Sequence, residues 1–453
     1  MASASTATLA MFAVTSAIAL IFIIGAMAAM TIAGLRAMAV NAIGARAQQW
    51  RACVRREAEA AAGREQMDAA SLLACAQAGL RVMDAESSEP LVTKDGAAAA
   101  LCGGAGYRLA KVFAQLQAEE AGSRGQPSTA AARARVLDDD ASFALASMAR
   151  EAPDARSLQV VCLGCATDTR PWRLRRGGAS RGPGAPTLVW INVDTAGAIE
   201  DRTRRLADGG LPTSVQVATK GNASKHSAVG SSRGGRSVAP LALSVDELRS
   251  VACELEVLGA LLPVLKQAGF DANAPTLWLM EGLLLSRLSA GRAAGLLREC
   301  VQASAPGSRL LATLLTQSVV DAATVMEKEV AAVSKAATQE AAVAAAAAPR
   351  SSGAAVAAAA ATAAEAEATR LLPLFPLPIQ AARCSTHDLL GPTGSSDALD
   401  SMGWSNMVLS QDLRAVVRQR YRVECAPAFS AFAAHGVLSR VTDVERVLSA
   451  VKA

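Results

Sequence analysis

Two short apolar segments of this sequence each end in residues that could contact a ligand. Residues 158–164 (LQVVCLG) end in Gly164, and residues 187–193 (TLVWINV) are followed by Asp194. A glycine at a strand end lets the backbone approach a ligand closely. A carboxylate at the next strand end can accept hydrogen bonds from both hydroxyls of a ribose. An aspartate at such a position is also a common helix N-cap, so both interpretations stay open.

Four short apolar segments have the composition of strands that are buried on both faces. They are residues 158–164, 187–193, 276–280 (TLWLM) and 309–315 (RLLATLL). Unalternating runs of this length are typical of parallel sheets covered by helices, and residues 290–303 have the pattern of such a helix. The sequence therefore predicts an α/β domain with a doubly wound sheet. The dinucleotide pattern GxGxxG is absent from its first turn, so no phosphate cradle is expected there.

Composition excludes few functions but narrows the choice. The 453 residues are 51% hydrophobic and only 3% aromatic, and much of the apolar content is alanine. The net charge is +5, and no Lys/Arg run is interleaved with aromatic residues, which argues against nucleic acid as the main partner. The nine cysteines lack the spacing of a disulfide framework. We interpret the single CxxC, Cys162 and Cys165, as two buried thiols rather than a redox or zinc site.

The N-terminus is predicted to be a membrane anchor. No charged side chain occurs from Ala2 to Leu35, and residues 9–35 exceed the ~20 apolar residues that span a bilayer. Several arginines follow this segment, so the positive-inside rule places the rest of the chain in the cytosol. A transit peptide for a chloroplast or mitochondrion, or a cleaved signal, is the alternative.

The rest of the chain is predicted to hold one enzyme domain that is interrupted by an insertion. Alternating charge and alanine at helical spacing indicates a stalk, and alanine tracts too poor in large apolar groups to form a core indicate the insertion. The predicted segments are an anchor or targeting segment (1–35), a helical stalk (36–76), the first part of the domain (77–326), the alanine-rich insertion (327–370) and the C-terminal part of the domain (371–453).

Two long motifs in the right order resemble the leucine carboxyl methyltransferase-like family. Residues 160–174 (VVCLGCATDTRPWRL) resemble its VVxLGxGxDTRxxRL signature, and residues 275–285 (PTLWLMEGLLL) resemble its PTLWxxEGLLxYL motif. Shorter similarities extend the resemblance to about residues 77–450; they lie at residues 81–101, 132–140 (ARARVLDDD) and 399–404 (LDSMGW). The resemblance implies a Rossmann-like class I methyltransferase sheet with a helical N-terminal cover, and S-adenosyl-L-methionine as cofactor.

The resemblance also implies which residues bind the cofactor. Arg133, at the first arginine of the family's RTRxIDD stretch, would pair with the methionine carboxylate, because a guanidinium can hold a carboxylate through two hydrogen bonds. Gly164 would line the methionine moiety. Asp168 with Arg170 would either hold the motif loop as an ion pair or contact the cofactor's amino end.

Two further residues complete the implied cofactor site. Asp194 would accept the ribose hydroxyls, and Glu281, from the EGLL motif at a strand end, would face the cofactor near the reacting sulfonium.

Three positions depart from the family's pattern. The family has an Asp-Leu pair after the third strand that reaches the adenine, and we expect residues 238–243 (VAPLAL) at that place. The tyrosine after EGLL is replaced by Ser286 and Arg287, and the second glycine of the LGxGxD loop is Ala166. Arg287 could hold an anionic acceptor if its side chain turns inward, or it could be a solvated arginine at a helix start.

The leading functional hypothesis is O-methylation of a carboxylate or hydroxyl on a small-molecule or protein acceptor. A carboxylate is already ionised at neutral pH and needs only orientation, and none of the three histidines (His226, His387 and His435) lies in a motif. One alternative is methylation of a protein's C-terminal leucine carboxylate, as in family members that act on a phosphatase. Others are methylation of a modified tRNA base and a degenerate membrane-tethered scaffold. The sequence does not indicate an oligomeric state.

Overall fold

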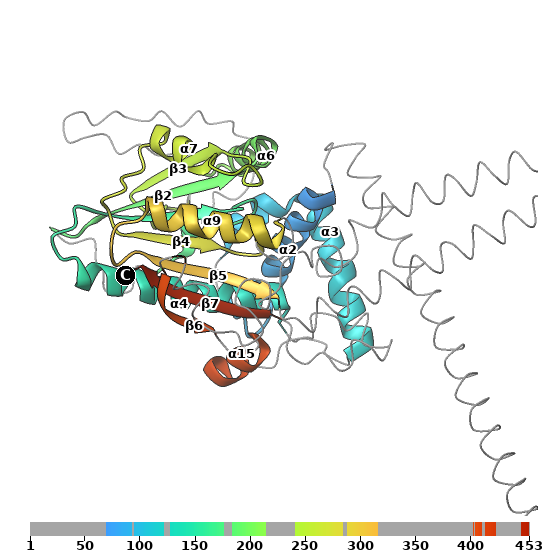
Figure 1. Cartoon of the computed structure of the whole chain (residues 1–453). Helices are drawn as coiled ribbons and strands as arrows, with labels where there is room; N and C mark the ends of the chain where they lie inside the picture. Colours follow the sequence, from blue (N-terminus) through green and yellow to red (C-terminus); the bar gives the residue numbers. More distant parts are fainter. Residues whose placement is uncertain are drawn as a thin grey trace, which may run out of the picture.

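The computed structural model describes ten parts of the chain, and a single mixed sheet runs through them (Figure 1). The described residues are 69–92, 95–121, 127–175, 184–213, 241–283, 288–315, 402, 404–409, 413–422 and 445–452. The strand order is β3-β2-β1-β4-β5-β7-β6. The strands are β1 (Ser157–Leu163), β2 (Thr187–Asp194), β3 (Glu247–Ala252), β4 (Thr276–Met280), β5 (Arg309–Leu315), β6 (Trp404–Leu409) and β7 (Glu445–Lys452).

The sheet is doubly wound, as the sequence predicted. Strands β1 to β5 are parallel, and β7 pairs antiparallel with both β5 and β6. The chain builds outward from β1 to β2 and β3, then crosses to β4 and β5 on the other side. The carboxyl ends of β1 and β4 therefore flank the point where the winding reverses, which is where open α/β sheets bind ligands.

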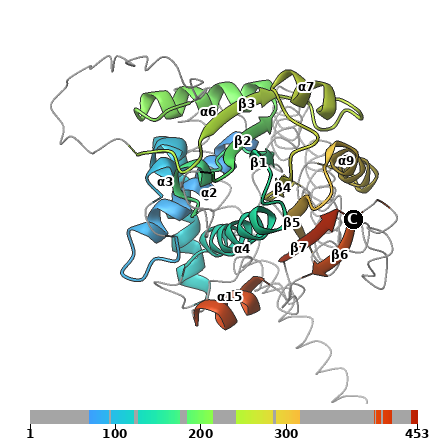
Figure 2. The same cartoon turned by 90° about the vertical axis from the view of Figure 1, so that its left-hand side faces the viewer.

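Helices cover both faces of the sheet because the central strands are apolar on both sides. In β1, Val160 and Cys162 belong to one core cluster, whereas Val161 and Leu163 belong to the other. The first face is covered by α3 (Gly96–Ala121), α4 (Thr129–Glu151), α6 (Ala196–Asp208) and α15 (Leu413–Tyr421). The second face is covered by α7 (Leu261–Gln267) and α9 (Ala290–Ala303), as Figure 2 shows.

Helix starts follow local capping chemistry. Ser128 caps α4 by accepting a hydrogen bond from the Ala131 amide (3.2 Å), and Thr195 caps α6 through the Ala198 amide (3.4 Å). Side-chain oxygens of this kind satisfy amide groups that have no partner inside the helix. The chain therefore enters α4 and α6 in defined directions, and both helices carry residues of the candidate site.

The predicted helical cover is α2 (Ala69–Ala85), which packs against α3. In Figure 1 both helices lie beyond the ends of the strands. Arg81 of α2 donates a hydrogen bond to the Thr167 carbonyl (2.6 Å), which places α2 against the loop that follows β1. Helix α2 begins before residue 77, so the predicted boundary between stalk and domain falls inside it.

The third strand is not where the sequence suggested. Residues 241–243 are in no helix or strand, and the strand that pairs with β2 is β3, Glu247–Ala252. It lies at the edge of the sheet and is only partly buried, so its side chains are mixed rather than uniformly apolar. The expectation that residues 238–243 follow the third strand is therefore wrong.

Several predicted segments lie outside the described residues. These are the anchor (1–35, with its apolar span 9–35), most of the stalk (36–76), the insertion (327–370), and much of the C-terminal part (371–453). None of the helices that the structure describes is both long and apolar enough to cross a membrane. The membrane anchor stays a prediction.

Trp278 of β4 offers a test of the core. It is 0% exposed, donates a hydrogen bond to Ser304 (2.6 Å) and lies against Phe270. Trp278→Ala should lower the free energy of unfolding by about 3–5 kcal/mol, because it removes buried contacts and leaves a cavity. Phe143→Ala is the control: Phe143 is 66% exposed, and its loss should change stability by about 0.5 kcal/mol or less. Urea unfolding measures both, and equal effects would contradict the core assignment.

Candidate functional site

The loop after β1 begins with a glycine that cannot be replaced without strain. Gly164 has φ +70°, a conformation that other residues adopt at a cost. A Cβ at this position would lie 3.1 Å from Leu283 Cδ1 and 3.2 Å from Leu283 Cβ. Leu283 follows β4 in the EGLL motif. The glycine therefore lets the ends of two neighbouring strands approach closely, and the predicted close approach to a ligand stays a prediction.

Two buried arginines hold the carbonyl groups of this loop. Arg202 of α6 donates to the carbonyls of Cys165 (3.3 Å), Ala166 (3.2 Å) and Asp168 (2.6 Å). Arg81 of α2 donates to the Thr167 carbonyl. Buried carbonyls need such partners. Neither arginine was predicted as a site residue.

A weak signal for Arg202 exists in the sequence. It occurs between Ile199 and Leu206 at helical spacing, so an arginine shares the apolar face of α6. Its guanidinium also lies 5.6 Å from the centre of the Trp172 ring. A charged residue on a buried helix face implies partners inside the fold, but not which ones.

Glu281, at the end of β4, is shared by two arginines. Arg133 of α4 donates from Nε to Glu281 Oε1 (3.0 Å), and Arg170 donates from Nη2 to Oε2 (2.6 Å). Burial acts to raise the pKa of Glu281, but the charges of Arg170 and then Arg133 outweigh it and hold that pKa well below its usual range. The carboxylate is therefore ionised at every physiological pH, and three distant segments meet at it.

Arg170 is fully buried and is the centre of the charged cluster. It begins the short helix α5 (Arg170–Arg173) and also donates to Asp138 (2.8 Å) and to Asp168 (3.0 Å). Burial alone would lower its pKa, yet the carboxylates of Asp168 and Glu281 raise it. A cation with three carboxylates around it has no exposed edge for a ligand.

Asp168 supports the loop from inside. Its Oδ1 accepts hydrogen bonds from the backbone amide and from Nη1 of Arg170, both at 3.0 Å, and its Oδ2 accepts one from the Cys162 thiol at 3.2 Å. These contacts favour the loop-stabilising interpretation of Asp168 and Arg170. Cys162 and Cys165 are buried free thiols, as predicted, and burial raises the pKa of both.

Asp194 joins the ends of β1 and β2. Its Oδ2 accepts from the Ala166 amide and its Oδ1 from the Thr195 amide, each at 2.9 Å. Thr195, and not Asp194, provides the side-chain cap of α6. The N-cap alternative for Asp194 is therefore wrong. The carboxylate is 1% exposed, so a ligand would have to uncover it.

The position of β3 changes the expectation for the adenine side of the site. Cys253 follows β3 directly, and its amide donates to the Asp194 carbonyl (2.8 Å). The next two residues are Glu254, which is exposed, and Leu255, which is 6% exposed. An acidic residue followed by leucine therefore stands after the third strand, where we had expected an apolar segment.

The remaining predicted position, Arg287, lies outside the described residues, as do 284–286. Within the described part of the chain no group of histidine, cysteine, aspartate and glutamate side chains could hold a metal ion. The predicted residues Arg133, Gly164, Asp168, Asp194 and Glu281 are all found at the carboxyl ends of β1, β2 and β4, or in contact with them.

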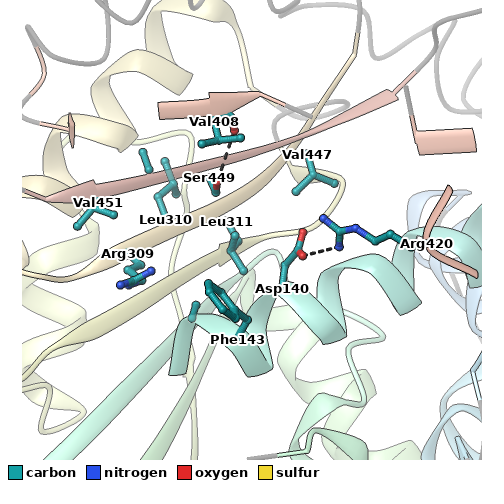
Figure 3. Close-up of a pocket in the computed structure, with 12 residues that line it drawn as sticks. Asp140, Phe143, Arg309, Leu310, Leu311, Val408, Arg420, Val447, Ser449 and Val451 are labelled. Atoms are coloured by element: carbon teal, nitrogen blue, oxygen red, sulfur yellow. Dashed lines mark hydrogen bonds and ion pairs between the residues drawn. The ribbon is translucent and has the colours of Figure 1, made fainter. Parts of the chain in front are cut away.

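A pocket of about 350 Å³ lies elsewhere, between α4 and the strands β5, β6 and β7 (Figure 3). Phe143 and Val408 line it, and Arg420 of α15 pairs with Asp140 beside it (2.6 Å). None of Arg133, Gly164, Asp168, Asp194 and Glu281 lines this pocket.

Comparison with known proteins agrees with the resemblance seen in the motifs. The family model for leucine carboxyl methyltransferase matches residues 74–300. That range contains every described site residue named above. No curated protein matches the chain.

The solved structures that match this chain are distant in sequence and have low TM-scores. A possible exported protein from Bordetella parapertussis is 13% identical, covers 85% of this chain and 97% of its own, and has a TM-score of 0.31. A duf574 family protein from Streptomyces avermitilis is 14% identical, with 76% and 91% coverage and a TM-score of 0.35. PKMT2 from Rickettsia typhi in complex with AdoHcy is 8% identical, with 66% and 49% coverage and a TM-score of 0.31.

Glu281→Gln should destabilise the fold in a pH-dependent way. A neutral amide cannot balance two guanidinium groups, so we expect a loss of about 3 kcal/mol near neutral pH. The folded pKa of Glu281 is lowered, so its stabilising contribution is fully present above the unfolded pKa of about 4.3 and is lost progressively as the pH falls from there toward the lowered folded pKa. The difference in unfolding free energy between wild type and variant should therefore shrink on acidification.

Urea titrations between about pH 3 and pH 7 measure this difference. Glu200→Gln, at an exposed position of α6, is the matched control and should have little effect at any pH. If the difference in unfolding free energy between wild type and Glu281→Gln stays constant with pH, the arginine partners do not lower the pKa of Glu281.

Proposed function

The chain belongs to the leucine carboxyl methyltransferase family and is an S-adenosylmethionine-dependent methyltransferase, and we propose that it methylates a carboxylate or hydroxyl oxygen of its acceptor. The observation that carries the proposal is the meeting of Arg133, Glu281 and the Gly164 loop at the carboxyl ends of β1 and β4. A cation, an anion and a close backbone approach at this edge suit a cofactor with a carboxylate, an ammonium and a sulfonium.

The residues present fit this cofactor group by group. Arg133 would hold the methionine carboxylate, because its side chain is 10% exposed beside Glu281 and carries several donors. Glu281, 18% exposed, would face the ammonium and sulfonium, and Gly164 would leave room for the methionine chain. Asp194 would accept the ribose hydroxyls once uncovered, since each of its oxygens has a second lone pair. Glu254 would accept from the adenine amino group.

Bound S-adenosylmethionine supplies an electrophilic methyl group, so the chain's own task is to orient the acceptor oxygen and to exclude water. A carboxylate acceptor is already ionised and needs no base. A reaction without a base agrees with this site, because its described charged groups are arginines and carboxylates held in ion pairs. All three histidines lie outside the described residues.

Two alternatives are less well supported. A degenerate scaffold was suggested by the altered adenine and tyrosine positions, but Glu254 and Leu255 follow β3 and would supply the adenine contact. Methylation of a protein's C-terminal leucine carboxylate would use the same chemistry as methylation of a small carboxylate. The entry segment at residues 81–101 is more similar to the branch of the family that acts mostly on small molecules, and we therefore favour a small acceptor.

Arg133→Ala and Asp194→Ala should each weaken binding of S-adenosylhomocysteine by about 10- to 150-fold, because each removes hydrogen bonds to a charged group worth about 1.5–3 kcal/mol. Calorimetry measures the dissociation constants. Arg204→Ala and Asp208→Ala on α6 are controls, since both side chains are more than half exposed.

Because Arg133 and Asp194 also have partners within the fold, circular dichroism should confirm that each variant is folded. Arg133→Lys and Asp194→Asn are the conservative substitutes if the alanine variants unfold. Folded variants of both residues with wild-type affinity would overturn the site assignment.

The acceptor prediction is that small carboxylic or phenolic acids are methylated in preference to a phosphatase C-terminal peptide. A labelled-methyl assay compares them, and the base lability of the product separates an ester from an ether. Arg287→Ala should reduce methylation of an anionic small acceptor if that side chain holds it. Efficient methylation of the peptide's terminal carboxylate, unchanged in Arg287→Ala, would contradict both statements.

A further inference from the structure

Gln77 of α2 contacts the arginine that is proposed to bind the cofactor's carboxylate. Its Oε1 accepts a hydrogen bond from Arg133 Nη2 at 3.1 Å. Gln77 precedes both family motifs and lies in no pattern that the sequence singled out. We propose that Gln77 is a positioning residue that orients the Arg133 guanidinium toward the carboxylate of S-adenosylmethionine. The inference rests on the proposed function and names a residue that specifies the same site.

Contacts with Glu281 and with Gln77 orient Arg133. Its Nε donates to Glu281 at the end of β4, and its Nη2 donates to Gln77 on α2. Both donors belong to the same side of the planar guanidinium, so the two acceptors together define its plane and its rotation. The end of the group, formed by Nη1 and Nη2, is the edge that can hold a carboxylate through two parallel hydrogen bonds. Gln77 is thus one of the contacts that set this edge.

The chemical type of residue 77 also matters. A guanidinium only donates hydrogen bonds, so the amide oxygen of Gln77 must face it. An amide oxygen orients Arg133 without adding a negative charge. Glu281 is the charged partner of Arg133, but it is also bound by Arg170 at 2.6 Å. A second carboxylate at position 77 would compete with the carboxylate of the cofactor for the same cation.

Helix α2 connects this contact to the loop after β1. Gln77 and Arg81 are four residues apart and therefore lie on one face of α2. Arg81 donates to the Thr167 carbonyl, and Gln77 accepts from Arg133. One helix face thus positions both the loop and the arginine. The contact with Arg133 explains why α2, a helix of mostly small apolar residues, has a glutamine on this face.

The experiment compares two ligands that differ in the group Arg133 is proposed to bind. S-adenosylhomocysteine carries the amino acid carboxylate, and 5′-methylthioadenosine lacks it. Gln77→Ala should weaken binding of S-adenosylhomocysteine by about 5- to 10-fold. The variant removes one hydrogen bond to Arg133, and Arg133 in turn is proposed to bind the carboxylate of the ligand. Binding of 5′-methylthioadenosine should stay within about twofold of wild type. Gln77→Glu should weaken S-adenosylhomocysteine binding further than Gln77→Ala.

Matched variants separate positioning from general damage. Gln267→Ala and Gln267→Glu, at an exposed position at the end of α7, should leave both affinities unchanged. Gln77→Met keeps the length of the side chain without the amide and replaces Gln77→Ala if the latter unfolds. In the double variant Gln77→Ala/Arg133→Ala, affinity should equal that of Arg133→Ala alone, because Gln77 acts through Arg133.

The outcomes distinguish this inference from the proposed function. If Arg133→Ala weakens only S-adenosylhomocysteine while Gln77→Ala weakens neither ligand or both equally, the role of Gln77 is wrong and the cofactor site stands. Additive losses in the double variant would also overturn the role of Gln77. If the wild-type protein binds neither ligand, the proposed function fails and the inference fails with it.

Discussion

The carboxylate of Glu281 is the interaction on which the site depends. It receives hydrogen bonds from Arg133 and Arg170 and thereby joins the end of β4 to α4 and α5. Two cations and one anion in a mostly buried place are stable only as a set, since removal of one member leaves charge without compensation. Arg170 extends the set to Asp138 and Asp168. The positions of Arg133 and Glu281 therefore follow from one charged cluster.

The loop after β1 is organised by the opposite arrangement, in which arginines bind carbonyl groups. Arg202 of α6 and Arg81 of α2 donate to its carbonyl groups. The Ala166 amide donates instead to Asp194. Buried guanidinium groups are expensive unless most of their donors are used. Arg202 donates from its two terminal nitrogens to backbone oxygens, and Arg81 divides its donors between the Thr167 carbonyl and Asp95, so the loop is held before any ligand binds. Preorganisation of this kind suits methyl transfer, where positioning provides most of the catalysis.

Three consecutive aspartates of α4 divide between two tasks. Asp138 faces the cluster through Arg170, whereas Asp140 pairs with Arg420 and Asp139 accepts a hydrogen bond from Tyr421, both of α15. Burial and then the hydrogen bond to Asp139 raise the pKa of Tyr421 to about 12, so this phenol stays a donor at neutral pH. The same turn of α4 thus connects the candidate site to the C-terminal part of the chain. The Asp140–Arg420 ion pair lies beside the pocket of Figure 3.

The sequence by itself determined the central sheet and the positions that carry the motifs. Strands β1, β2, β4 and β5 match the predicted apolar segments within a residue or a few, because burial on both faces leaves a continuous local signal. Strand β3 carries no such signal. It is an edge strand with mixed exposure, so its sequence contains polar residues and does not form an apolar run. For the same reason the sequence did not single out Glu254, which follows this strand.

Only the tertiary structure decided which side chains meet. Arg133 and Glu281 are far apart in the chain, as are Gln77 and Arg133, and no spacing rule relates such residues. The structure also showed that Asp194 is not the cap of α6 and that Asp168 and Arg170 are paired within the loop. Local sequence patterns indicate whether a residue is buried, because burial affects the type of each residue separately. Ion pairs depend on where distant segments are placed by packing, and that information is distributed over the whole core.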